Sequence, residues 1–126
     1  MSALARLGLC ELALGALLGW VVAISIERRE WLVRLRITSP KRVLQCHLDF
    51  LMMGLILIGV SLVLPDLATA WQLLVAFGSV VNPSLFGVLA FSERAVGTKA
   101  YRAVTLVSFT AMSTGLVAAA VTGLTT

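Results

Sequence analysis

His47 is the only histidine in the chain, and it lies at the start of an apolar segment long enough to form a membrane-spanning helix. An ionisable ring at such a place is costly unless it has a partner. Imidazole is also the commonest metal ligand among side chains. His47 is therefore a candidate metal ligand. The alternative is an interior histidine that forms only hydrogen bonds.

Asp49 is a second candidate for chemistry on the same segment. It follows His47 by two residues, which corresponds to about 200° around a helix. The two side chains are thus expected on nearly opposite faces, and Asp49 is a poor partner for the His47 of its own subunit. It either faces a neighbouring helix or subunit, or pairs with Arg42 or another basic residue at the membrane surface.

Two further polar side chains, Glu11 and Asn82, fall inside apolar segments. Glu11 either reaches water near the outer end of its segment or belongs to a proton-coupled binding site. Small multidrug transporters carry one essential glutamate in their first helix, but the motif around that glutamate is not found here. Asn82 precedes Pro83, so it could hydrogen-bond across helices, cap the carbonyls that the proline frees, or face a substrate.

The face of the helix that carries His47 also presents Phe50, Leu51, Gly54 and Ile58, because residues three or four apart are neighbours on a helix. An aromatic ring, aliphatic side chains and a glycine make a plausible wall for a flat macrocycle. The same stripe is equally compatible with ordinary helix packing.

The composition indicates a membrane protein. Hydrophobic residues make up 60% of the 126 residues and charged residues 13%, whereas a soluble domain is about half apolar and about a quarter charged. The chain divides into four segments of roughly 20 apolar residues, each sufficient for a hydrocarbon core of ~30 Å. These segments are residues 4–26, 43–64, 68–91 and 103–124. We predict an all-α four-helix transmembrane bundle in which residues 1–126 form a single domain. The first segment lacks the cleavage site of a signal peptide, so we expect it to be a retained helix.

The basic residues are unevenly distributed. Nine of the ten lysines and arginines lie in two links, and Arg6 is the exception. The nine are Arg28, Arg29, Arg34, Arg36, Lys41, Arg42, Arg94, Lys99 and Arg102. This pattern follows the positive-inside rule, so no nucleic-acid partner is needed to explain the net charge. We expect a multi-pass inner-membrane protein with both links in the cytoplasm and both termini outside.

The residues around His47 resemble a family motif. The run His47-Leu48-Asp49-x-x-Met52-x-Gly54 is similar to the His-Leu-Glu-Gly-x-Met-Asn-Gly motif of the hydroxylaminobenzene mutases, which are small four-helix membrane proteins. The related styrene oxide isomerases have a histidine at the same distance before a Val-Leu-Pro, which is residues 63–65 here.

Weaker similarities follow in the same order along the chain. Gly78-x-x-x-Asn82 resembles a Gly-x-x-x-Asn in the third helix of the mutases, and Gly97-Thr98 fits their Gly-Ser. The resemblance covers most of the chain, and the motif in the second segment is its main support.

In the isomerase branch, the resemblance implies a haem b held between the subunits of a homotrimer. His47 would be the axial metal ligand, and Phe50, Leu51 and Gly54 would contact the cofactor. The ferric iron would act as a Lewis acid on a small lipophilic epoxide or arylhydroxylamine that partitions into the bilayer. Asn82 and Asp49 are the candidate catalytic residues of this intramolecular rearrangement, which needs no net redox change.

The chain also departs from the family pattern. Met53 replaces the family's asparagine and Phe50 replaces the glycine of the mutase motif, while the tyrosine and aspartate of the isomerases' third helix fall at about Ser92 and Ser84. A thioether at Met53 could fill or crowd the distal side of the iron. Two alternatives follow: a non-catalytic haem protein or accessory subunit for electron transfer or sensing, and a small transporter built around Glu11.

Overall fold

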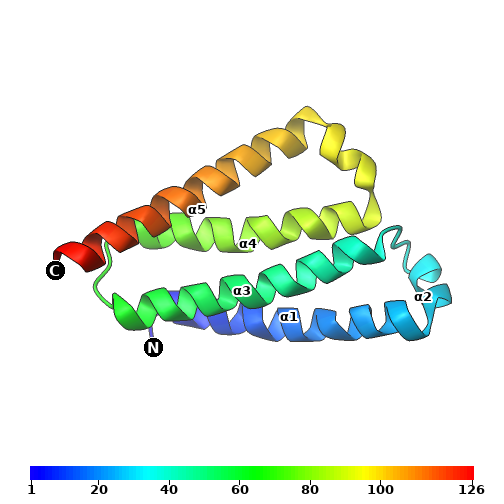
Figure 1. Ribbon diagram of the computed structural model, residues 1–126, viewed down its shortest axis with the longest axis horizontal. Helices are drawn as coiled ribbons and strands as arrows, with labels where there is room; N and C mark the ends of the chain where they lie inside the picture. Colours follow the sequence, from blue (N-terminus) through cyan, green and yellow to red (C-terminus); the bar gives the residue numbers. More distant parts are fainter.

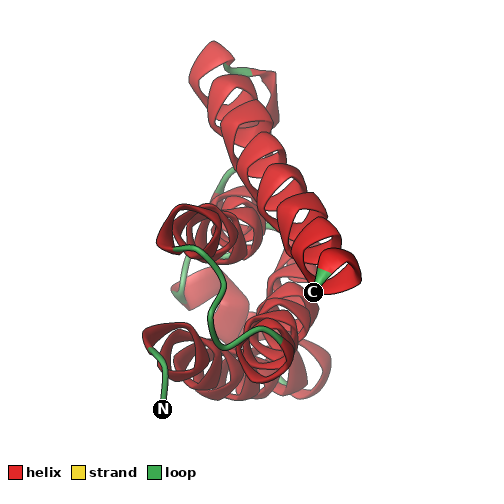
Figure 2. Cartoon of the chain, turned by 90° about the vertical axis from the view of Figure 1, so that its left-hand side faces the viewer, coloured by secondary structure: helices red, strands yellow, loops and turns green.

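The computed structural model describes residues 1–126, and its regular structure consists of helices with no strand (Figure 2). The four long helices are α1 (Ala3–Glu27), α3 (Pro40–Val63), α4 (Thr69–Phe91) and α5 (Lys99–Thr125). Each is long and apolar enough to cross a membrane. The predicted all-α fold with four apolar helices is confirmed. The largest difference in helix bounds is at the start of α5, which begins at Lys99 instead of residue 103.

The links between the long helices lie at the two ends of the bundle (Figure 1). The short helix α2 (Arg29–Arg34) and the 3-10 helix η1 (Glu93–Gly97) share one end. We call it the basic end, because residues 28–42 and 92–102 there contain nine of the ten basic side chains. Both termini and the turn from α3 to α4 lie at the opposite end.

Local sequence explains where several helices begin and end. The hydroxyl oxygens of Ser2 and Thr98 accept hydrogen bonds, each 3.1 Å long, from backbone N–H groups in the first turns of α1 and α5, as N-cap residues do. Pro40 is the first residue of α3, a position where its missing N–H costs nothing. α2 is closed by Arg36 at φ 60°, with the Ile37 N–H donating to the Leu32 carbonyl at 2.9 Å.

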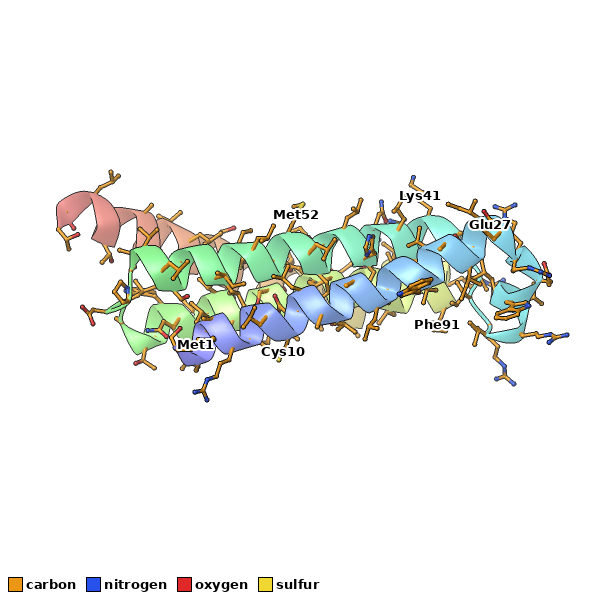
Figure 3. All side chains as sticks on the ribbon, turned by 90° about the horizontal axis from the view of Figure 1, so that it is seen from below. Met1, Cys10, Glu27, Lys41, Met52 and Phe91 are labelled. Atoms are coloured by element: carbon orange, nitrogen blue, oxygen red, sulfur yellow. The ribbon has the colours of Figure 1, made fainter.

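Glycines allow α1 and α3 to pack side by side along the bundle (Figure 3). A Cβ atom on Gly8 would lie 2.8 Å from the Gly54 carbonyl oxygen, and one on Gly54 would lie 2.7 Å from the Gly8 carbonyl oxygen. Neither position has room for a side chain. Small residues of this kind let membrane helices approach closely, so these two glycines set the separation of α1 and α3.

The apolar core lies towards the end that carries the termini, and α5 joins it there. Its buried members come from all four long helices, and they are Leu4, Met53, Leu57, Val75 and Met112. A Cβ atom on Gly78 would lie 2.6 Å from Cβ of Met112, so α4 and α5 are in backbone contact at this level. From there the two helices diverge towards the basic end (Figure 1), and a cavity lies between them.

Candidate functional site

His47 lies on the face of α3 that packs against α1. Its Nδ1 atom is 2.6 Å from the Gly15 carbonyl oxygen. A carbonyl oxygen only accepts hydrogen bonds, so Nδ1 carries the hydrogen and Nε2 of the neutral ring keeps a free lone pair. Gly19, one turn further along α1, makes room for the ring, because a Cβ atom there would lie 3.1 Å from His47 Cε1. Two glycines of α1 therefore orient the imidazole and leave Nε2 available to a ligand.

The other residues predicted to contact a cofactor lie in helix packing within one subunit. A Cβ atom on Gly15 would lie 2.8 Å from Leu51 Cδ2, Gly54 touches the backbone of α1, and Phe50 is buried. These contacts agree with the packing interpretation of the stripe. Contact of Phe50, Leu51 and Gly54 with a haem stays a prediction.

Asp49 lies on the other side of α3 and lines a cavity of about 350 Å³ between α3, α4 and α5. The residues around the cavity are Asp49, Met53, Asn82, Leu85, Phe86, Tyr101, Thr105 and Phe109. The two predicted catalytic residues, Asp49 and Asn82, therefore share one cavity, together with Met53. Its size is within the range of about 300–1,000 Å³ for small-molecule sites.

Asp49 does not pair with Arg42. The Arg42 guanidinium donates a hydrogen bond of 2.9 Å to the Gln45 side-chain oxygen, and its Nε atom is 3.7 Å from a carboxylate oxygen of Glu93. Arg42 thus connects α3 to η1 at the basic end. Asp49 forms no salt bridge with it and lines the cavity.

Asn82 is buried and is held by α5. Its Oδ1 atom accepts a short hydrogen bond from the Ser108 hydroxyl, so the cross-helix interpretation of this residue is the one the structure shows. The amide NH₂ of Asn82 forms no hydrogen bond within the protein and can donate to a molecule in the cavity.

Sequence reasoning missed Tyr101 and Thr105, which line the same cavity. The Tyr101 hydroxyl donates to the Leu85 carbonyl at 3.3 Å, which links the start of α5 to α4. Tyr101 is the only tyrosine of the chain, and its spacing of four residues from Thr105 places both on one face of α5. The single tyrosine and its spacing from Thr105 are the features of the sequence that could have indicated these two residues.

Glu11 does not reach water. Its side chain is 3% exposed, and neither carboxyl oxygen has a hydrogen-bond partner. Ser84 and Ser92, near which the resemblance places the isomerases' aspartate and tyrosine, are exposed and do not line the cavity. The Ser84 hydroxyl donates within its own helix, to the Val80 carbonyl at 2.6 Å.

The His, Cys, Asp and Glu side chains form no cluster of three or more that could hold a metal ion. A metal bound through His47 would thus receive one ligand from each chain. Iron in a porphyrin needs only one or two further ligands, since the macrocycle supplies the other four, and one imidazole is a common axial ligand. A single available Nε2 atom fits a haem better than a bare ion.

No protein-family model, curated protein or solved structure matches the chain. Fold and site alone define its class. It is an all-helical protein with four helices able to cross a membrane, consistent with a multi-pass membrane protein. On one side of α3 it carries an oriented histidine, and on the other a cavity with polar groups.

Proposed function

We propose that the protein binds haem b through Nε2 of His47 and rearranges a small lipophilic epoxide or arylhydroxylamine. The observation that carries this proposal is the hydrogen bond between Nδ1 of His47 and the Gly15 carbonyl. Histidines that bind metals usually donate their other N–H to a carbonyl or carboxylate, which fixes the tautomer and the ring orientation. The resemblance of residues 47–54 to the mutase motif supports the same assignment.

A homotrimer would bring the two halves of such a site together. His47 and the cavity of Asp49 and Asn82 lie on opposite sides of α3. In a cyclic trimer, each subunit meets its neighbours through two different surfaces. The His47 side of one subunit can then face the cavity side of the next, with the haem between them.

The residues of the cavity suit the proposed rearrangement. Bound haem would supply a ferric Lewis acid for the substrate oxygen. The NH₂ group of Asn82 would orient that oxygen, and the Asp49 carboxylate would stabilise positive charge on the carbon whose bond to oxygen breaks. Phe86 and Phe109 would hold the lipophilic part of the substrate and exclude water.

The second candidate is a haem protein without catalytic activity. Met53 favours it, because its thioether lines the cavity where the family has an amide and lies 9% exposed in the core cluster. A thioether is a common second axial ligand in electron-transfer haem proteins.

An absorption spectrum of the purified protein tests haem binding. We expect a Soret band in the wild type and loss of most bound haem in His47→Ala. Gln45→Ala is the matched control: it lies on the same helix and hydrogen-bonds only to Arg42, so its haem content should not change. Equal haem content in His47→Ala and Gln45→Ala would refute the assignment of the ligand.

A further inference from the structure

Glu11 is a buried acid that the proposed function does not use. Neither of its carboxyl oxygens has a hydrogen-bond partner. Ser79 of α4 lies beside it, but the Ser79 hydroxyl donates to the Ala76 carbonyl at 2.7 Å. Cys10, the preceding residue, is on the exposed side of α1 (Figure 3). A buried polar group without a partner is rare, and an ionisable one inside a membrane usually belongs to a functional site.

Asp49 is a second carboxyl group without a cation. Asp49 lies on α3, which packs side by side with α1, the helix that carries Glu11. The two salt bridges of the chain both lie at the basic end. Arg6, the one lysine or arginine elsewhere, is exposed. The middle of the bundle therefore holds two acidic side chains and no lysine or arginine.

The cavity that Asp49 lines has the other features that an organic cation needs. The rings of Phe86, Tyr101 and Phe109 form part of its wall, and the faces of aromatic rings attract cations. Residues of α4 and α5 line the cavity, and these two helices diverge towards the basic end (Figure 1). Phe109, one of the lining residues, is 55% exposed. An amphiphilic molecule in the bilayer can therefore enter from the side.

We propose that this cavity binds a small lipophilic ammonium ion, with Asp49 as its direct counter-ion and Glu11 as a second negative charge deeper in the bundle. The apolar body of the ligand lies against the aromatic wall. The ion supplies the positive charge that the two acids lack. This inference goes beyond the proposed function and does not use bound haem, because residues of one subunit line the cavity and His47 is not among them.

Equilibrium dialysis of labelled 2-phenylethylamine against the full chain in nanodiscs at pH 7 tests the proposal. An alkyl amine is protonated at this pH, as a lysine side chain is. We expect saturable binding that 2-phenylethanol, a neutral molecule of similar shape, does not displace. Asp49→Asn should weaken binding by about tenfold or more, because truncating one member of a buried charge pair is costly. Glu11→Gln should weaken it by a smaller factor.

Glu93→Gln is the matched control, because Glu93 is an exposed acid that pairs with Arg42 at the basic end. Its affinity for the amine should equal that of the wild type. Displacement by 2-phenylethanol, or unchanged affinity in both Asp49→Asn and Glu11→Gln, would overturn the proposal.

A second measurement covers the case in which the acid variants do not fold. A ligand that binds only the folded state raises Tm with its concentration. The amine should therefore raise the Tm of the wild type and the alcohol should not, and a wild type whose Tm does not respond to the amine contradicts the proposal. His47→Ala should still bind the amine, because His47 does not line the cavity. Haem content and amine binding are measured separately, so a failed haem assignment and a failed ammonium site give different results.

Discussion

The Ser108 hydroxyl donates a hydrogen bond to the side-chain oxygen of Asn82, and this bond joins α5 to α4 beside the cavity. Ser108 is fully buried and Asn82 is 8% exposed. The bond occupies the oxygen of the amide and leaves its NH₂ group unpaired. It thus holds two walls of the cavity together and determines which end of the Asn82 amide a ligand can use.

Ser108→Ala should destabilise the protein by about 1–3 kcal/mol, because it leaves the buried Asn82 oxygen without a donor. Chemical unfolding in detergent measures this. Ser84→Ala is the control, since the Ser84 hydroxyl bonds only within its own helix on an exposed face, and its effect should lie within about 0.5 kcal/mol of zero. If the two variants were equally stable, the bond between Ser108 and Asn82 would not contribute to the free energy of unfolding.

Gly19→Ala should lower haem binding without removing the ligand itself. The new Cβ atom would lie 3.1 Å from His47 Cε1, so the ring has to shift by a few tenths of an ångström, which strains its hydrogen bond with Gly15. Complete loss of such an orienting contact typically weakens metal binding about 10–100-fold, and a strained contact should cost less. Haem titration followed by the Soret band measures the change.

Gly59→Ala is the control for this substitution. Gly59 is a helical glycine of α3, and a Cβ atom there would have no neighbour within 4 Å, so the exchange adds the same atom without a contact. Its haem affinity should match the wild type. A Gly19→Ala protein with unchanged affinity would show that the hydrogen bond to Gly15 does not orient the ligand.

The four long helices could be predicted because the relevant physics is local. A chain inside a bilayer must satisfy its backbone hydrogen bonds within each segment, so apolar length alone locates the helices. The placement of His47 and Asp49 on opposite sides of α3 was predictable for the same reason, since it follows from helix geometry over two residues.

The cavity and the buried acid were not predictable, because they depend on contacts between distant residues. Tyr101 and Asn82 line one cavity only because α4 and α5 touch at Gly78 and Met112 and diverge beyond them. The sequence left Glu11 either near water or in a binding site, and the residue is buried because its side of α1 faces the bundle. Hydropathy gives the depth of a residue in the membrane, and helix packing decides which way its side chain faces.

A cysteine at Thr98 should report the orientation of the protein in the membrane. The basic end is expected in the cytoplasm, because lysines and arginines next to membrane helices stay on that side. Thr98 is exposed at that end, while of the native cysteines Cys10 is exposed and Cys46 is buried. In a Cys10→Ala background, Thr98→Cys should react with an impermeant maleimide only after the inner membrane is permeabilised. Labelling in intact cells would reverse the assigned topology.

Asn82→Ala should reduce turnover more than haem content. The NH₂ group of Asn82 is the amide donor in the cavity that remains free to orient a substrate oxygen. Removing one such donor costs about 10²–10³-fold in rate in well-studied enzymes. Turnover of an aryl epoxide without oxygen, reductant or nucleotide, measured per bound haem, provides the comparison. A proportional loss of haem and activity would assign Asn82 a structural role.

Met53→Asn separates the catalytic from the non-catalytic haem protein. Met53 lines the cavity with Asn82, and asparagine there would supply the amide that the mutase motif carries. If the thioether closes the iron's open position, the wild type should be six-coordinate and slow, and Met53→Asn should be five-coordinate and faster. Dithionite should then lower epoxide turnover, because ferrous iron is the weaker Lewis acid.

Met52→Asn is the control, since Met52 is 56% exposed on the outer face of α3 (Figure 3). Its exchange should change neither the absorption spectrum nor the rate. A Met53→Asn protein that gains an open coordination position but converts neither an epoxide nor an arylhydroxylamine would favour electron transfer or sensing.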